Sequence, residues 1–222
     1  MARRDAATTL KRWMVFVIVI VMMIDGVVVV TEGQWLSAVL ILAIALLILF
    51  VTVFSDRLAV QLPVEFELLA LAFVFAALFL GEVRSYYDRI WWWDIALHAT
   101  SGLLMGILGF LLVYVLNASE KIAVSMTPRF VAFFAFVFAV AVGSLWEIFE
   151  FGMDSIFHTR MQKPMLGDMS GLTDTMWDMI VNAIGAAFIS ALGWWHMKRE
   201  RRSFIDDWIQ KFIRRNPHWF NS

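Results

Sequence analysis

Three apolar segments of this 222-residue chain carry acidic, histidine or asparagine side chains at helical spacing. The polar residues are Asp94 and His98 in the first segment, Glu147, Glu150 and Asp154 in the second, and Asp174, Asp178 and Asn182 in the third. Side chains three or four positions apart lie on one face of a helix, so each segment presents its polar groups on one side. A charged group at the centre of a membrane span costs about 2.5–3.5 kcal/mol on insertion scales, and facing stripes therefore indicate a functional site.

The spacing and the residue types suit chelation of a divalent metal. Pairs at i, i+4 and i, i+3 direct two ligands to one point, as in the carboxylate sites of helical bundles. Mostly oxygen ligands with one imidazole favour Zn, Mn, Mg or Fe. The predicted metal ligands are Asp94, His98, Glu147, Glu150, Asp174 and Asp178, and the predicted catalytic groups are Glu147, Glu150 and Asp178. Asp88, Asp154 and Asn182 are assigned to the surrounding polar site.

Charge balance leaves two interpretations of this cluster. The layer that holds it has nine acids against four basic residues, namely Glu82, Asp88, Asp94, Glu147, Glu150, Asp154, Asp168, Asp174 and Asp178 against Arg84, Arg89, Arg160 and Lys163. Either a bound metal neutralises the excess, or some carboxyl groups stay protonated. Protonated pairs of this kind serve as proton relays in transporters. In a third interpretation the polar residues only fix helix packing, with Asn182 as an interhelical hydrogen-bond donor.

Composition assigns the chain to the polytopic membrane proteins. It is 61% hydrophobic and 17% charged, with a mean hydropathy of +0.76. Six apolar runs approach the roughly 20 residues that a helix needs to cross the hydrocarbon layer: Trp13 to Val30, Leu36 to Phe54, Val64 to Leu80, Trp91 to Leu116, Phe130 to Phe151 and Met176 to Met197. The prediction is an all-α bundle of six transmembrane helices over residues 1–200. We predict a separate cytoplasmic tail over 201–222.

The distribution of basic residues predicts the orientation. With the N-terminus inside, fourteen of the 18 Lys and Arg residues fall on the inner side, as cytoplasmic segments prefer. Both termini are therefore predicted to be cytoplasmic, and the polar stripes then lie at the outer face. Asp25 in the first span lies in the same outer half, where it joins the cluster or pairs with a backbone group. The net charge of −1 averages a basic inner face and an acidic outer one, and it gives no indication of nucleic-acid binding.

Two segments outside the spans have predicted roles. Ile205, Trp208, Ile209, Phe212 and Ile213 recur at helical spacing among basic residues, which predicts an amphipathic helix on the anionic inner leaflet; a docking helix for a partner is the alternative. The segment from His158 to Thr175 is predicted to be an irregular outer loop that covers the site as a lid. The chain has no cysteine, so disulfides and thiolate metal sites are excluded.

The polar residues also carry a family resemblance over about the last 140 positions. The run from Asp88 to Asp94, Leu97-His98-Ala99 with Gly102, Trp146-Glu147 with Glu150, and the string from Asp174 to Gly185 resemble the YjdF-like bacterial inner-membrane proteins. More loosely, the chain is similar to the VanZ-like family, whose Asp-x-x-x-His and Asp-x-x-x-Asn-x-x-Gly helices run in the same order. The Glu-Gln step of that family is replaced here by Glu150 and a distant Gln162. The resemblance implies a multispan helical fold in the bacterial inner membrane and little about chemistry.

Two active functions remain compatible with these residues. The first is a metal-dependent hydrolase or transferase that acts on a lipid or lipid-linked headgroup at the outer leaflet. The second is a proton- or cation-coupled transporter that uses the same acids. No Ser-His-Asp set, glycine-rich phosphate loop or arginine clamp narrows the reaction, and the sequence does not determine an oligomeric state. A structural membrane protein is the third prediction, and membrane lipids are the expected partners of all three.

Overall fold

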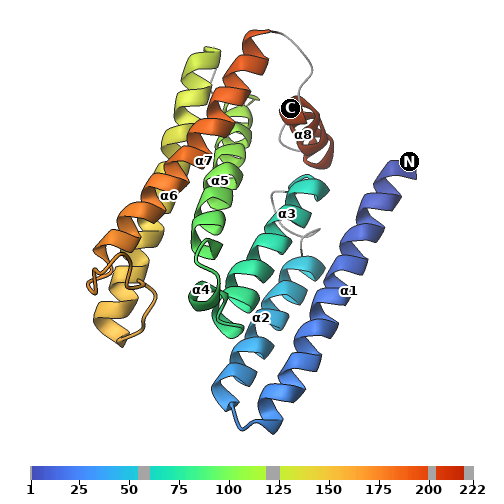
Figure 1. Cartoon of the computed structure of the whole chain (residues 1–222). Helices are drawn as coiled ribbons and strands as arrows, with labels where there is room; N and C mark the ends of the chain where they lie inside the picture. Colours follow the sequence, from blue (N-terminus) through green and yellow to red (C-terminus); the bar gives the residue numbers. More distant parts are fainter. Residues whose placement is uncertain (1, 55–60, 119–125, 200–203, 218–222) are drawn as a thin grey trace. The chain divides into compact units, whose positions relative to one another are not determined.

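The computed structural model describes residues 2–54, 61–118, 126–199 and 204–217. Within them six helices are long and apolar enough to cross a membrane, so the predicted all-α polytopic architecture is confirmed (Figure 1). They are α1 (Ala2–Thr31), α2 (Trp35–Phe54), α3 (Val64–Val74) continued by the π-helix η2 (Phe75–Val83), α5 (Trp93–Ala118), α6 (Pro128–Phe157) and α7 (Leu172–Lys198). Two shorter helices are α4 (Tyr86–Arg89) and α8 (Phe204–Arg215). The predicted domain boundary at residue 200 lies outside the described residues.

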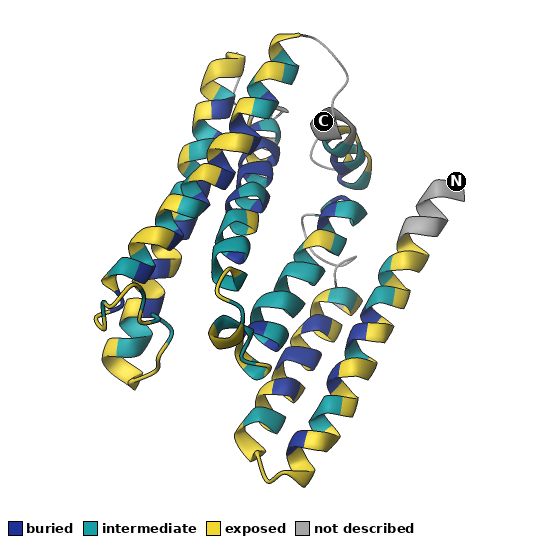
Figure 2. Ribbon diagram, viewed as in Figure 1, coloured by how far each residue is buried: buried dark blue, intermediate teal, exposed yellow. Residues whose placement is uncertain are grey.

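The outward surfaces of the long helices are apolar, as lipid contact requires. Large hydrophobic side chains such as Leu36, Trp35 and Leu145 are more than 60% exposed. Figure 2 shows exposed residues along most of α1, α2, α6 and α7, with the buried ones confined to narrow stripes. A helix that is apolar all round is typical of a membrane span. The chain is therefore a multi-pass membrane protein.

The chain divides into two compact units, and the first covers Met1–Trp93 with Arg214–Asn216. Its core lies where α1 packs on α2 and η2, and the buried residues there include Val15, Met22, Ile41, Ile48 and Phe79. On η2, a Cβ on Gly81 would come within 2.4 Å of the Tyr87 ring, so glycine allows the following segment to pack closely. The second unit covers Asp94–Ile213 with 217–222, and it contains the residues predicted to form the site.

Small residues bring α5, α6 and α7 of the second unit into close contact. A Cβ on Gly102 of α5 would lie 2.1 Å from the Asn182 carbonyl oxygen of α7. A Cβ on Gly109 would lie 2.8 Å from the Ala135 backbone of α6. In membranes such close approach replaces the hydrophobic effect as the main source of helix association. These contacts set the distances between the polar stripes on the three helices.

Several predicted boundaries differ from the structure. The first span was expected to begin at Trp13, but α1 begins at Ala2. The differences that bear on the site lie at α6 and α7. The fifth span was expected to end at Phe151, but α6 continues to Phe157, where His158 takes a left-handed cap conformation with φ 55°. The sixth span begins at Leu172, not at Met176, so Asp174 belongs to a helix. The irregular loop therefore covers only residues 158–171 and not His158 to Thr175. At 30 residues α6 is about 45 Å long, which matches a bilayer with its headgroup layers, and polar residues are tolerated in those last turns.

Candidate functional site

The polar site is built from one end of each of the helices α5, α6 and α7. Asp94 and His98 occupy the first two turns of α5, Glu147 and Glu150 lie in the last third of α6, and Asp178 lies in the second turn of α7. The buried face of α6 continues from Ala139 and Gly143 to these acids at intervals of three or four. The three- or four-residue spacing that predicted the polar stripes also places their side chains on the buried faces of the helices.

His98 lies at the centre of the cluster. Its Nε2 is 3.4 Å from Asp94 Oδ1 and 3.7 Å from Asp178 Oδ2. Its Nδ1 is 3.8 Å from Glu147 Oε1. One ligand atom from each of Asp94, His98 and Asp178 lies within 4.8 Å of the other two. The two ring nitrogens therefore face different carboxylates.

Two buried carboxylates of this cluster have oxygen atoms that lack a hydrogen-bond partner. Asp178 is 1% exposed and Glu147 is 4% exposed. Asp178 Oδ1 and both Glu147 oxygens have no hydrogen-bond partner among the described residues, although the Thr175 hydroxyl is close enough to interact with Glu147. Buried polar groups are normally paired, so such atoms indicate a missing proton, ion or ligand. This observation is independent of the residue types that predicted the site.

Glu150 and Asp174 lie at the edge of the cluster and have partners of their own. Glu150 Oε1 accepts a hydrogen bond of 2.8 Å from the Trp146 indole, one helical turn earlier. Asp174 Oδ2 accepts a 2.7 Å bond from the Lys163 backbone N–H. Neither belongs to the group of three residues with mutually close ligand atoms. We call these three, Asp94, His98 and Asp178, the inner set. The other predicted ligands, Glu147, Glu150 and Asp174, lie outside it.

Asp154 and Asp88 have different surroundings from the inner set. Asp154 Oδ1 accepts a bond from Met161 N at 2.8 Å, and its Oδ2 accepts one from Gln162 N at 3.0 Å. It therefore organises the loop after α6. Asp88 is an exposed residue of α4 in the first unit. Arg84 Nη1 donates a hydrogen bond to Asp25 Oδ1 at 2.9 Å. The sequence had predicted that Asp25 joins the cluster or pairs with a backbone group, so its partner is a different one.

Asn182 acts at the level of helix packing. Its Nδ2 donates to the Ala139 carbonyl of α6 at 3.3 Å, one turn of α7 below Asp178. A Cβ on Gly143 would lie 2.3 Å from that Nδ2 atom. Asn182 thus connects α6 to α7 directly beneath the acids, as the interhelical interpretation expected.

The loop over residues 158–171 is attached to the ends of α6 and α7 by side chains that the prediction did not assign. Gln162 Nε2 donates to the Thr175 hydroxyl at 2.8 Å, and the Lys163 backbone binds Asp174. Thr175 follows Asp174 directly in the sequence, and this neighbourhood was the only sequence feature that pointed to its role in holding the loop. The predicted lid is thus held against the helix that carries Asp178.

The first turn of α7 depends on Asp168. This carboxylate accepts bonds from the backbone N–H and the hydroxyl of Ser170, at 2.8 and 2.7 Å, and from the same groups of Thr173, both at 2.9 Å. The Ser170 hydroxyl and these further donors hold the pKa of Asp168 well below its usual value. Because the folded pKa is depressed, the stabilisation is complete above the unfolded value of about 3.9 and is lost as pH falls below it.

We therefore expect an acid-dependent opening at the start of α7. Amide hydrogen exchange, corrected for intrinsic rates, should show higher protection of Ser170 and Thr173 in wild type than in Asp168→Asn at pH 6. The difference should shrink progressively below about pH 4, where the Asp168 carboxyl of the opened state becomes protonated while that of the folded state is still ionised. An equal difference at pH 6 and pH 2.5 would contradict the role of the ionised carboxylate.

Comparison with known proteins gives a family for the chain. Residues 10–199 match the family described as "Predicted membrane protein (DUF2238)". The chain belongs to this family. A relative from Thermotoga maritima, named "Uncharacterized protein", is 26% identical over 125 residues. That match covers 56% of this chain and 59% of the relative, so the chain spans less than two thirds of the relative's length. No solved structure matches the chain.

Proposed function

We propose that Asp94, His98 and Asp178 bind one divalent metal ion. The observation that carries this proposal is the combination of three mutually close ligand atoms with the enclosed, unpartnered Oδ1 of Asp178. The oxygen-rich set with one imidazole suits Zn, Mn, Fe or Mg. Three protein ligands leave coordination positions for water and substrate, as in catalytic metal sites.

The arrangement around His98 supports a separate role for Glu147. Since Nε2 faces Asp94 and Asp178, it is the nitrogen placed to bind the metal, and Nδ1 faces Glu147. A carboxylate on the second nitrogen of a ligating histidine fixes its tautomer and its ring orientation. Glu147 is therefore a positioning residue for His98 and a proton acceptor within the site. Glu150 and Asp174 support the same layer from its edge.

The reaction class follows from the chemistry of this ligand set. A metal bound there would polarise a phosphoryl or carbonyl oxygen or activate water. We infer a hydrolase or transferase that acts on a lipid or lipid-linked headgroup. The support is that the site lies on membrane-spanning helices, at the ends of α6 and α7 that the loop over residues 158–171 connects. Arg160 and Lys163 in that loop supply basic groups that would meet a phosphate. The location that follows is the bacterial inner membrane, with both termini cytoplasmic.

Family membership agrees with the YjdF-like resemblance, while the VanZ-like similarity stays at the level of the two helix patterns. The unpartnered carboxylates also support a second candidate, a proton- or cation-coupled carrier, because such groups are typical of proton relays. The contact of Asn182 with Ala139 supports the structural alternative. The first candidate predicts a bound metal, whereas a proton-coupled carrier and a structural protein predict none.

Elemental analysis by mass spectrometry tests the proposal directly. Wild type, purified without metal-affinity chromatography, should hold close to one Zn, Mn or Fe per chain, or bind Mg in a calorimetric titration. Asp178→Asn should lose this metal, because it removes a ligand oxygen from the inner set. Glu147→Gln should weaken binding by about 10–100-fold, the usual effect of losing the group that orients a ligand.

The matched control is Glu32→Gln, which neutralises an exposed carboxylate in the first unit. It should keep the full metal content. A wild-type protein that contains no metal and binds none of Zn, Mn, Fe(II) or Mg would overturn the proposal. Proton flux into sealed vesicles that stops in Asp178→Asn would then support the carrier. Equal metal content in wild type and Asp178→Asn would place the metal elsewhere.

A further inference from the structure

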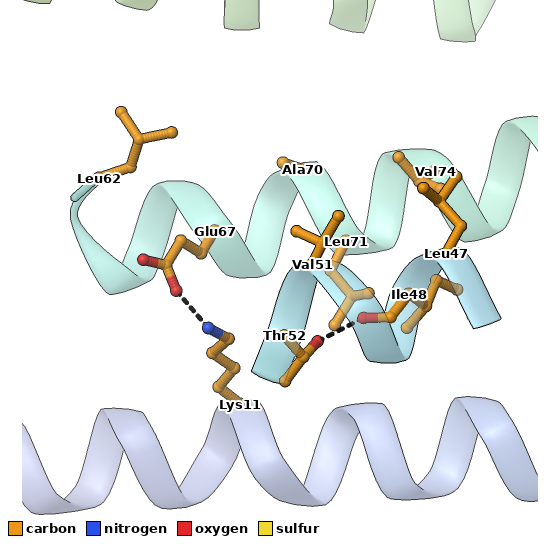
Figure 3. A pocket seen from close by; sticks show the side chains of 10 residues that line it. All are labelled: Lys11, Leu47, Ile48, Val51, Thr52, Leu62, Glu67, Ala70, Leu71 and Val74. Carbon is orange, nitrogen blue, oxygen red and sulfur yellow. Dashed lines mark hydrogen bonds and ion pairs between the residues drawn. The ribbon is translucent and has the colours of Figure 1, made fainter. Parts of the chain in front are cut away.

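The first unit contains an apolar cavity that the metal site does not involve. It has a volume of about 220 Å³ and lies among α1, α2 and α3. Figure 3 shows Leu47, Ile48 and Val51 of α2 near Leu71 and Val74 of α3, with Lys11 reaching from α1 towards Glu67. The remaining lining residues are Thr52, Leu62 and Ala70. The cavity is therefore a hydrocarbon-lined space with charged groups at one end.

The charged end combines basic groups from both ends of the chain. Lys11 Nζ lies 2.5 Å from Glu67 Oε2, and Arg215 Nη1 lies 2.9 Å from Glu67 Oε1. Arg215 also donates to the Leu62 carbonyl, which is part of the cavity wall. Glu67 therefore holds two cations at the mouth. Ion pairs of this kind need the headgroup layer or a polar ligand, because hydrocarbon alone does not solvate them.

Two further cations adjoin these residues in the sequence. Arg12 follows Lys11 in α1, and Arg214 precedes Arg215, and both are exposed. Arginine binds phosphate through paired N–H donors. Among the three groups that meet at the polar end, Lys11 and Arg215 outnumber Glu67 by one positive charge, which complements an anion. An exposed arginine adjoins each of these two cations in the sequence.

We propose that this cavity binds an acyl chain of an anionic phospholipid, with the phosphate contacted by Arg12 and Arg214. The apolar walls formed by α2 and α3 match the chain, and the basic mouth matches the headgroup. A lipid is the occupant because the cavity lies among membrane-spanning helices, where phospholipid is the surrounding solvent. Each basic residue near a surface contributes roughly 1 kcal/mol to the binding of anionic lipid, so two of them produce a measurable preference. The assignment is independent of the metal site.

Native mass spectrometry of the full chain released from detergent tests this assignment. Phosphatidylglycerol and phosphatidylcholine with identical chains are the two probes. Wild type should retain phosphatidylglycerol at least about 10-fold more strongly, which is the ratio for 1.4 kcal/mol. The double variant Arg12→Gln with Arg214→Gln should bind both lipids equally, because it lacks the two arginines that contact the phosphate. The substitutions leave the ion pairs of Glu67 in place, so the cavity itself should be unchanged.

A second variant tests the cavity itself. Ala70→Trp places a large ring in the space, and it should reduce retention of both lipids about 10-fold. The control Leu69→Trp adds a similar ring one position away, on a side chain that is 48% exposed, and it should bind lipid as wild type does. Equal retention of the two lipids by wild type would overturn the headgroup contact. Unchanged retention in a folded Ala70→Trp would overturn the assignment of the lipid to this cavity. If that variant does not fold, the comparison of wild type with the Arg12→Gln and Arg214→Gln double variant decides the proposal.

Discussion

Replacing Gly102 by alanine is expected to separate α5 from α7 and to destabilise the second unit strongly. The new Cβ would lie 2.1 Å from the Asn182 carbonyl oxygen and 2.9 Å from the Ala186 nitrogen. Both are backbone atoms, so no side-chain rotation can relieve the contact. Overpacking usually costs about 1–3 kcal/mol, and we expect the upper end of that range or more. Circular dichroism during thermal unfolding in detergent measures the loss.

The matched control is Gly152→Ala in α6, where an added Cβ would meet nothing within 4 Å. There the substitution should leave the protein unchanged or stabilise it by up to about 1 kcal/mol, because alanine is the better helix former. The displaced Asn182 lies one turn from Asp178, so Gly102→Ala should also weaken metal binding. Equal melting of the two glycine variants would show that α5 and α7 are not in this contact.

Asp178→Asn is expected to stabilise the metal-free protein while it abolishes metal binding. The Asp178 side chain is 1% exposed, and its Oδ1 has no hydrogen-bond partner among the described residues. A buried polar group without a partner costs about 1–3 kcal/mol, and more when it is charged. Asparagine keeps the shape without the charge. In the metal-free state the variant should therefore melt above wild type, with a difference of about 1–3 kcal/mol.

Added metal should reverse this order. A ligand at 100 times its dissociation constant stabilises the folded state by about 2.7 kcal/mol, so wild type gains that amount and Asp178→Asn gains nothing. Functional sites are commonly built at the expense of stability in this way. The measurement is a pair of melting curves for each protein, one with a chelator and one with excess metal.

Asp154→Asn is the contrasting control. Asp154 accepts bonds from Met161 and Gln162, so its replacement should lower stability in both conditions and leave the metal-induced gain intact. If metal-free Asp178→Asn loses as much stability as Asp154→Asn, Asp178 has a stabilising partner in the apo protein. The idea that Asp178 is held ready for a cation would then be wrong.

The sequence by itself determined the membrane class, the six spans and the helix face that carries each polar stripe. Hydropathy and the 3.6-residue period are local properties, and a local pattern is enough to give them. The stripes on α5, α6 and α7 do meet at one end of these helices. The ends of α6 and α7 were misplaced, because polar residues in the outer turns resemble loop residues to a hydropathy window while the helix continues through the headgroup layer.

Only the tertiary structure decided which polar residues converge. Six ligands were predicted, and the packing separates Asp94, His98 and Asp178 from the others. That choice depends on the distance and rotation between helices, which Gly102 and Gly143 set through contacts with Asn182. The ring orientation of His98 likewise depends on Glu147 and Asp178, which are distant in the chain. The role of Asp154 depends on backbone groups of a loop, where no periodic pattern predicts the contacts. Local spacing determines a face, and the contacts between helices determine what that face meets.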